Sequence, residues 1–531
     1  MMNAIDSPLR QLDLGVEHFD AEAINSKENR SLYEARKKIH PKRVSGNYRR
    51  FKWIVMFGTL GIYYITPWLR WERGEGFPNQ AVLLDLANRR FYFFFIEIWP
   101  HEFFYVAGLL VMAGIGLFLV TSVLGRAWCG YTCPQTVWVD LFLVVERFFE
   151  GERNARIKLD AEPWSASKLY KRIAKHAVWL LIAIATGGAW VFYFADAPTL
   201  LMELLTGEAH YTAYASVALL TATTYIFGGL MREQVCTYMC PWPRIQAAML
   251  DEHSLTVTYN DWRGEPRSRH AKRMRKEGVP TGDCVDCNAC VAACPMGIDI
   301  RDGQQLECIT CALCIDACDA VMQRLGLEKG LIAYSTLNDY EANMALAGAG
   351  KHVHMPTIIP ENVRDVSGRL SEKIKGFTPS YFLRTRTLVY TAIYVAIGVA
   401  LITSLVLRDR LDVKVLADRN PQFVLLSDGS IRNGYELRIL NMKAESKQFL
   451  VTIGGLRDAI ITGEGMHDSQ NHWAVIEAEP DALKSARIFI TLPRHRVSGT
   501  ITEFTFNVAE MGGLDRKTVE VKFNAPEEMG P

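Results

Sequence analysis

The sequence predicts a multidomain membrane protein with an α-helical transmembrane bundle of about five spans, an inserted cysteine-rich domain and a C-terminal β-sandwich. Three observations predict this architecture. Apolar residues form long runs with almost no charge, eight of the twelve cysteines lie between residues 284 and 318, and alternating apolar and polar residues replace the long runs after residue 407. The first feature indicates a membrane environment, and the second indicates metal chemistry.

The overall charge limits the classes of partner. The chain has 531 residues, with 59 Lys and Arg against 58 Asp and Glu, which excludes a strongly basic nucleic-acid-binding protein. Twelve cysteines are too dilute in a chain of this length for a small disulfide scaffold. We therefore expect membrane lipid as a partner and no nucleic acid.

Five runs are long and apolar enough to cross a bilayer, which needs about 20 such residues. The first run is the shortest and carries Pro67. A further stretch, Thr136–Phe149, is short and carries Asp140 and Glu146, so we expect an interfacial or re-entrant helix there. A sixth span at this place would invert the topology of everything that follows. The five runs are Trp53–Leu69, Phe103–Gly125, Ala177–Ala195, Ala209–Met231 and Thr387–Leu407.

Lys and Arg are unevenly distributed among the connections. They are abundant before the first run and between the second and third, whereas the loop Asp196–Glu208 has none. Because positive residues favour the cytoplasmic side, we expect the N-terminus inside and, after five spans, the C-terminal domain outside. This predicts a multi-pass protein of a bacterial inner membrane. The expected parts are a cytoplasmic N-terminal segment 1–50, a membrane domain 51–250, a cytoplasmic cysteine-rich domain 251–330, a cytoplasmic connector 331–386, a last membrane helix 387–407 and a periplasmic domain 408–531.

The strongest signal in the chain is a pair of four-cysteine runs. Each has the spacing C-x2-C-x2-C-x3-C, which bacterial ferredoxins use to hold [4Fe–4S] clusters. Three cysteines of a run ligate one cluster, and the fourth ligates the other. Zinc is the alternative, but zinc usually takes two C-x2-C pairs rather than two such runs. We therefore expect a 2[4Fe–4S] ferredoxin domain with the ligand sets Cys284, Cys287, Cys290 and Cys318, and Cys308, Cys311, Cys314 and Cys294.

The other four cysteines form a repeat. The segment Cys129–Pro134 follows the second apolar run, and Cys236–Pro241 follows the fourth, with the pattern C-x-Y-x-C-P in both. In an α-helix, residues four apart have Cβ atoms about 5–6 Å apart, which suits two thiolates on one metal better than a disulfide. Such soft ligands select Cu(I), zinc or iron–sulfur clusters, and inert buried cysteines are the alternative. The candidate ligands are Cys129, Cys133, Cys236 and Cys240.

The C-terminal domain alternates apolar and polar residues in short runs. About seven strands in roughly 120 residues predict an immunoglobulin-like sandwich. It contains no cysteine, so we expect a docking or spacer role, with a stabilising cap as the alternative. The runs are Glu436–Leu440, Phe449–Ile453, Ala486–Thr491, Glu503–Asn507 and Thr518–Phe523, with turns expected at Asp428-Gly429 and Asn433-Gly434.

Taken together, the spans, both C-x3-C-P motifs, the two four-cysteine runs and the C-terminal sandwich resemble the CcoG/FixG/RdxA family over nearly the whole chain. These are accessory proteins of cbb3-type cytochrome c oxidase. The resemblance implies electron transfer that reduces Cu(II) to Cu(I) for the oxidase copper centre, with transient copper on the four C-x3-C-P cysteines. It also implies oxidase subunits, or copper chaperones and transporters, as partners. The electron donor has no recognisable signature in the sequence.

Two other functions stay open at this stage. One is a quinol-linked electron conduit of the NapH/NosR kind, which a quinone pocket would favour. The other is an assembly scaffold without catalytic activity, in which the clusters sense the redox state and the outer domain docks oxidase subunits. Three weaker sites are His101 and His210 near the outer ends of spans, and the candidate copper ligands His352, His354 and Met355.

Overall fold

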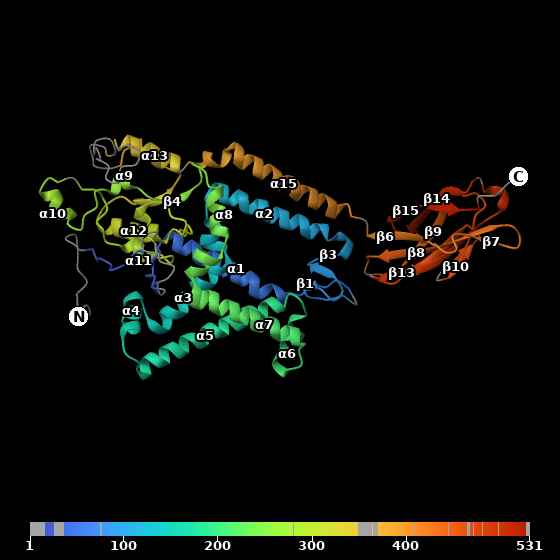
Figure 1. Cartoon of the computed structure of the whole chain (residues 1–531), viewed down its shortest axis with the longest axis horizontal. Coiled ribbons are helices and arrows are strands. Elements are labelled where there is room, and N and C mark those ends of the chain that lie inside the picture. The colour runs from blue at the N-terminus through green and yellow to red at the C-terminus, as the bar shows by residue number, and fades with distance from the viewer. Residues whose placement is uncertain are drawn as a thin grey trace. The chain divides into compact units, whose positions relative to one another are not determined.

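The computed structural model divides the chain into two units (Figure 1). The first comprises Met1–Trp71 with Gln80–Val399, and the second comprises Glu72–Asn79 with Ala400–Pro531. His352, His354 and Met355 lie outside the described residues. The structure describes residues 16–25, 37–74, 77–279, 281–348, 364, 370–376, 378–408, 410–443, 445–464, 468–470, 472–480, 482–497 and 499–526.

Within the described ranges, four helices are long and apolar enough to cross a membrane, not five. The first predicted run instead belongs to α1 (Asn47–Ile65), whose opening turns carry Arg49, Arg50 and Lys52. These three cations lower the hydropathy of a helix that is otherwise of spanning length. The four helices are Pro100–Leu124, which contains η2 (Pro100–Glu102) and α2 (Phe104–Leu124); α5 (Ala166–Val191); Tyr211–Met231, which contains α7 (Tyr211–Thr224) and η4 (Tyr225–Met231); and α15 (Thr385–Val406).

The apolar stretch expected to be interfacial forms α3 (Pro134–Glu150). It is not among the four candidate spans. The side chains of Asp140, Glu146 and Glu150 are buried, so the polar face of this helix packs inside the protein. Asp140 and Glu146, which in the sequence argue against a membrane span, therefore have partners within the protein.

The cysteine-rich segment forms a small domain of two helices and a two-stranded sheet. Strands β4 (Thr256–Tyr259) and β5 (Ile332–Ser335) pair antiparallel and lie on either side of the cysteine runs in the chain. Helices α11 (Ala289–Ala293) and α12 (Leu313–Arg324) contribute to a core that includes Cys284, Cys290 and Cys318. The cysteines thus lie in a core to which both helices and the two-stranded sheet contribute.

This domain also fixes the start of α1, and Figure 1 shows α12 beside that helix. The backbone N–H groups of Tyr48 and Arg49 donate to the carboxylate of Asp316 in α12, at 3.3 and 2.7 Å. A negative side chain at a helix N-terminus satisfies free N–H groups and complements the helix dipole. A Cβ added at Gly46 would lie 2.2 Å from Asp316 Cγ, so glycine is needed for this approach.

In the described part of the second unit, two five-stranded sheets form the immunoglobulin-like sandwich, which gives ten strands where about seven were expected. All five predicted runs lie inside strands, and their inward residues alternate along each strand, as in β8 (Ile431–Asn441). Asp428-Gly429 is a turn, but Asn433-Gly434 lies within β8, where the Asn433 side chain is buried beside the Tyr435 hydroxyl. The first sheet has the order β10 (Ile460–Glu464), β13 (Ala482–Leu492), β8 and β6 (Leu411–Ala417), with β7 (Val424–Leu425) on β8. The second has the order β11 (Asp468–Gln470), β12 (Trp473–Ala478), β9 (Lys447–Gly454), β14 (Ile501–Glu510) and β15 (Arg516–Asn524).

The remaining elements complete the two units. In the first they are η1 (Thr66–Trp68), β1 (Val82–Asp85), β2 (Arg90–Phe93), β3 (Ile96–Ile98), η3 (Trp128–Thr132), α4 (Arg153–Ala161), α6 (Ala197–Thr206), η5 (Val235–Met239), α8 (Trp242–Met249), α9 (Asp261–Gly264), α10 (Ala271–Lys276), η6 (Ile300–Asp302), α13 (Leu337–Leu346) and η7 (Pro379–Leu383). In the second they are β6 (Leu411–Ala417), β7 (Val424–Leu425), β9 (Lys447–Gly454), β10 (Ile460–Glu464), β11 (Asp468–Gln470), β12 (Trp473–Ala478), β13 (Ala482–Leu492), η8 (Arg494–Arg496), β14 (Ile501–Glu510) and β15 (Arg516–Asn524).

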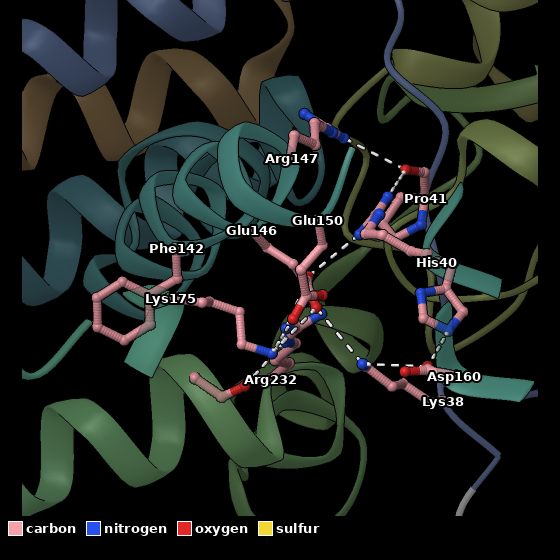
Figure 2. Close-up of polar contacts among 12 residues, drawn as sticks. Lys38, His40, Pro41, Phe142, Glu146, Arg147, Glu150, Asp160, Lys175 and Arg232 are labelled. Carbon is pink, nitrogen blue, oxygen red and sulfur yellow. Dashed lines mark hydrogen bonds and ion pairs between the residues drawn. The ribbon is translucent and has the colours of Figure 1, made fainter. Parts of the chain in front are cut away.

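A buried ion cluster centres on Glu146 of α3 (Figure 2). Its fully buried carboxylate lies 2.8 Å from Arg232, 3.1 Å from Arg156 and 3.5 Å from Lys38. Lys175 lies 4.0 Å away and also pairs with Glu150 at 2.8 Å. Burial alone would raise the pKa of Glu146, but Arg232, Lys38, Arg156 and Lys175 outweigh it and lower the pKa to about 2. The cluster joins the N-terminal segment, α3, α4, α5 and the end of η4.

Glu146→Gln should destabilise the first unit strongly. The substitution keeps the side-chain shape but leaves several buried cations without their shared carboxylate. Breaking a buried ion pair in this way costs about 3–5 kcal/mol of unfolding free energy. Thermal unfolding of the detergent-solubilised full chain, followed by tryptophan fluorescence, measures the loss.

The matched control is Glu277→Gln. Glu277 pairs with Arg273 at 2.8 Å, but the two side chains are 52% and 75% exposed. An exposed pair of this kind contributes about 0–1 kcal/mol. Equal melting temperatures for the two variants would mean that the Glu146 cluster does not stabilise the unit.

Candidate electron-transfer site

Two cavities are ringed by the cysteines of the four-cysteine runs. The first cavity, of about 350 Å³, is lined by Cys284, Cys287, Cys290 and Cys318. The second, of about 370 Å³, is lined by the other four together with Cys290. The fourth cysteine of each run thus lies at the cavity formed by the other run, as the expected ligand sets require. Four convergent thiols around a space of this size fit a [4Fe–4S] cluster.

The backbone around the two cavities is the same. Asp286 and Asn288 flank the second cysteine of the first run with φ of 49° and 57°, and Thr310 and Ala312 flank that of the second run with φ of 53° and 59°. These left-handed residues turn the chain around the cavity. The N–H of Asp286 donates to the sulfur of Cys284, and the N–H of Thr310 donates to the equivalent sulfur of the second run. Such donors stabilise sulfur that carries negative charge.

Each cavity also has one buried arginine that the sequence motifs do not reveal. Arg301 interacts with the thiolates of Cys284 and Cys290 and is held by Asp286 at 2.7 Å and Asp299 at 2.6 Å. At the second cavity, the guanidinium of Arg126 donates to the carbonyl oxygens of Leu306 and Cys308. A fixed positive charge favours the reduced, more negative form of an adjacent cluster.

The two C-x3-C-P motifs form π-helical turns, not the α-helical turns that we expected. In η3 and η5 the hydrogen bonds run from residue i+5 to residue i: Cys133 N to Trp128 O at 2.9 Å, and Cys240 N to Val235 O at 2.8 Å. Both turns are five residues long and begin 107 residues apart. Single π-turns are frequent at functional sites. The sequence repeat is therefore also a repeat of backbone structure.

The first of these turns packs directly on the loop of the second cavity. Cys129 and Cys236 share a buried cluster with Ile309, Cys311 and Leu313. A Cβ added at Gly130 would lie 2.7 Å from Ile309 O and 3.1 Å from Cys311 N. The Tyr131 hydroxyl donates to Cys311 O at 3.3 Å. Gly130 thus allows the closest approach of the membrane motif to the ferredoxin loop.

Cys133, Cys236 and Cys240 lie near enough to Cys129 to influence its ionisation. Burial is the largest of the influences that raise the pKa of Cys129 to about 12; the neighbouring Cys133, Cys236 and Cys240 act in the same direction, and Arg126 opposes them. Four such thiols ionise together only when a cation compensates their charge. Within the described residues, however, no three His, Cys, Asp or Glu side chains are placed to hold a single metal ion.

One partner of this thiol group was not apparent from the sequence. Gln246 of α8 is fully buried, and its Oε1 accepts a hydrogen bond from Cys129 Sγ at 2.9 Å. Its Nε2 donates to Thr121 Oγ1 at 3.2 Å. A lone glutamine ten residues after a cysteine carries no sequence signal for this role. His210, one of the weaker candidates, is the N-cap of α7, and its side chain accepts a hydrogen bond from the backbone N–H of Thr212.

Sequence models of known families match three segments. A 4Fe-4S dicluster domain matches residues 231–337, a 4Fe-4S binding domain matches 106–150, and the model described as "IG-like fold at C-terminal of FixG" matches 401–526. The chain therefore carries iron–sulfur clusters, and the predicted architecture of membrane helices, ferredoxin domain and immunoglobulin-like domain is confirmed. The second match covers Cys129 and Cys133 of the first C-x3-C-P motif.

Three curated proteins are similar over most of the chain. Nitrogen fixation protein FixG of Rhizobium meliloti is 59% identical over 97% of this chain and 98% of its own length. Protein RdxB of Cereibacter sphaeroides is 54% identical over 82% of this chain and 86% of its own. Protein RdxA of the same organism is 48% identical over 91% of this chain and 95% of its own.

Gly130→Ala should selectively weaken the second cluster. The added Cβ meets the backbone of Ile309 and Cys311, which cannot rotate away as a side chain could. We expect the spectroscopic signal of one cluster to fall by about half or more while the other is retained, because core overpacking typically costs about 1–3 kcal/mol. Gly114→Ala is the control, since a Cβ there meets nothing within 4 Å. Equal iron content and spectra in both variants would contradict this reading.

Arg301→Gln should lower the reduction potential of the first cluster. Loss of one buried positive charge near the thiolates should shift the potential by on the order of 50 mV, or about 1.2 kcal/mol for one electron. Potentiometric titration followed by electron paramagnetic resonance separates the two clusters. The control is Arg267→Gln, whose side chain is 37% exposed. Unchanged potentials in Arg301→Gln would show that the guanidinium does not tune the cluster.

Proposed function

Because the chain belongs to the FixG/RdxA family of iron–sulfur proteins, we propose that it reduces Cu(II) to Cu(I) for assembly of a cbb3-type cytochrome c oxidase. Each cupric ion gains one electron, which a bound, reduced [4Fe–4S] cluster would supply. The thiols release their protons when copper binds, and no leaving group is involved. The four C-x3-C-P cysteines are the proposed copper ligands, and the eight ferredoxin cysteines are the proposed cluster ligands in the two sets given above.

One observation carries this proposal: the packing of the C-x3-C-P turns on the loop of the second cavity. Gly130 and Tyr131 contact the backbone around Cys311, which lines that cavity. Bound clusters supply single electrons. A copper ion on the four thiols would receive them across van der Waals contacts, so neither the domain nor the ion has to move between electron entry and reduction.

The chemistry of the thiols supports the choice of substrate. Thiolates are soft ligands and stabilise Cu(I) relative to Cu(II), so they favour the reduced product. The high pKa of Cys129 means that the site stays protonated until a cation arrives. Because the described thiols are not placed to hold a single ion, we expect copper to draw them together as it binds.

The arrangement in the membrane is part of the proposal. The cationic start of α1 and the Lys/Arg-rich segments favour the cytoplasm for the N-terminus and the ferredoxin domain. The exposed Phe57, Ile62 and Ile65 of α1 suit contact with lipid and make it the fifth span. The immunoglobulin-like domain then lies in the periplasm of a bacterial inner membrane. There it would dock oxidase subunits or copper chaperones.

An anaerobic copper assay on the purified full chain tests the proposal. The clusters are reduced, excess reductant is removed, and Cu(II) is added with a Cu(I)-specific chelating dye. We expect Cu(I) to form in step with cluster oxidation, one ion for each electron. The variant with Cys129, Cys133, Cys236 and Cys240 all changed to Ser should form Cu(I) at least about tenfold more slowly, since it lacks the thiolates that bind copper.

The control for exposed clusters is a soluble oxidant. Both proteins should transfer electrons to ferricyanide at similar rates, because their ferredoxin cysteines are unchanged. If the fourfold variant also reduces copper as fast as the wild type, copper is taking electrons directly from the ferredoxin domain. The copper site proposed here would then be wrong, and the conduit or scaffold function would replace it.

A further inference from the structure

A third cavity lies between the ferredoxin domain and α3, and it is larger than the two ringed by cysteines. It exceeds each of those two in enclosed volume. Its walls come from the N-terminal segment, α1, α3, the second C-x3-C-P turn and the ferredoxin loops. Met296, Ile309 and Leu313 form an apolar side next to the second cavity, and Cys236 also lines it. No step of copper reduction as proposed above uses this space.

Buried cationic groups in its wall have N–H groups without partners. Arg49 and Arg232 are 7% and 5% exposed, so both are more than nine-tenths buried. Within the described part of the chain, Arg49 Nη2, Arg147 Nε and Arg232 Nη1 donate no hydrogen bond to the protein. A buried donor left unsatisfied costs about 1–3 kcal/mol, and more when it is charged. All three belong to side chains that line the cavity, so a ligand that accepts hydrogen bonds would satisfy them after a small side-chain movement.

The backbone at Arg232 provides independent support. Its φ is +47° and its ψ is −111°, which is a strained conformation for a bulky residue. The equivalent residue of the first repeat, 107 positions earlier, is Gly125, with φ +57° and ψ −123°. Glycine adopts this conformation without strain. The second repeat therefore retains an arginine where the fold itself favours glycine, which points to a role for its side chain.

The charge of the wall identifies the class of ligand. Five cationic side chains and two acidic ones line the cavity, a formal excess of three positive charges. Glu146 pairs with Arg232 and Glu17 pairs with Lys42 without lining the cavity, and including both still leaves an excess of one. We propose that this cavity binds a phosphate-type oxyanion, carried either by an acidic phospholipid headgroup or by free phosphate. Guanidinium groups bind such oxygens through strong, charge-assisted hydrogen bonds.

A neutral ligand fits these observations less well. A quinone would occupy the apolar side and accept one or two hydrogen bonds, but it would leave the excess positive charge uncompensated. An oxyanion satisfies both the charge and the free donors. Since Met296, Ile309 and Leu313 flank cluster cysteines in the sequence, a bound anion also adds negative charge near the second cluster. Its binding should therefore lower the reduction potential of that cluster.

Arg147→Gln is the variant that tests the site. Arg147 makes one hydrogen bond, from Nη2 to Pro41 O at 3.4 Å, and forms no ion pair in the described ranges, so its loss strands no carboxylate. The control is Arg50→Gln, which removes the same charge from an exposed neighbour of Arg49 that does not line the cavity. If Arg147→Gln fails to retain its iron, Lys42→Gln removes a cavity cation that is 36% exposed and whose partner Glu17 is 33% exposed.

Two probes are used on the full chain in detergent. Bound phospholipid is counted by mass spectrometry and phosphorus NMR, and inorganic phosphate is titrated into delipidated protein by calorimetry. We expect the wild type and Arg50→Gln to behave alike within about twofold, and Arg147→Gln to bind about tenfold more weakly, because it removes one positive charge from the wall. Retained phospholipid identifies the headgroup as the source, whereas phosphate binding without retained lipid identifies the free ion.

Three results would overturn the proposal. The first is that neither probe binds the wild type, and the second is that both probes bind the wild type and Arg147→Gln equally. The third is that a quinone occupies the site and is lost in Arg147→Gln. A drop in the potential of the second cluster when phosphate is added to the wild type, absent in Arg147→Gln, would support the proposal without reference to copper.

Discussion

The buried carboxylate of Glu146 is the interaction on which the membrane unit depends. Several cations from separate elements converge on it, and each is positioned by that convergence. Arg232 is the member that connects the cluster to the redox chemistry, because it lies four residues before Cys236. Charges buried this deeply are unfavourable unless all of them are compensated. The cluster therefore specifies one arrangement of the helices around the second C-x3-C-P turn.

Much of this architecture could be predicted from local patterns. The cysteine spacing predicted the ferredoxin domain, the apolar runs predicted the membrane helices, and the alternation after residue 407 predicted the sandwich. These features repeat over short distances and depend on few contacts. α1 falls outside the four helices because Arg49, Arg50 and Lys52 lie just before the run Trp53–Leu69 but inside the helix that contains most of it.

The parts that could not be predicted depend on contacts between distant residues. Gln246 meets Cys129 across 117 positions, and Arg126 meets Cys308 across 182. No sequence motif places an arginine or a glutamine at a fixed spacing from a cysteine, so the sequence does not reveal these contacts. The π-helical turns were also missed, because C-x3-C reads as one turn of an ordinary helix. In the structure, Gly130 of the first π-helical turn lies against the backbone of Ile309, a contact that the sequence does not reveal.

The cap that Asp316 provides to α1 has a consequence for biogenesis. Asp316 stands between Cys314 and Cys318, so the segment that surrounds the clusters also completes the first helix of the chain. The ribosome makes α1 more than 250 residues before its cap. We therefore expect α1 to enter the membrane with free N–H groups and to become fixed only after the ferredoxin segment folds. Cluster insertion would then act as a late checkpoint, coupling the supply of iron and sulfide to completion of the membrane domain.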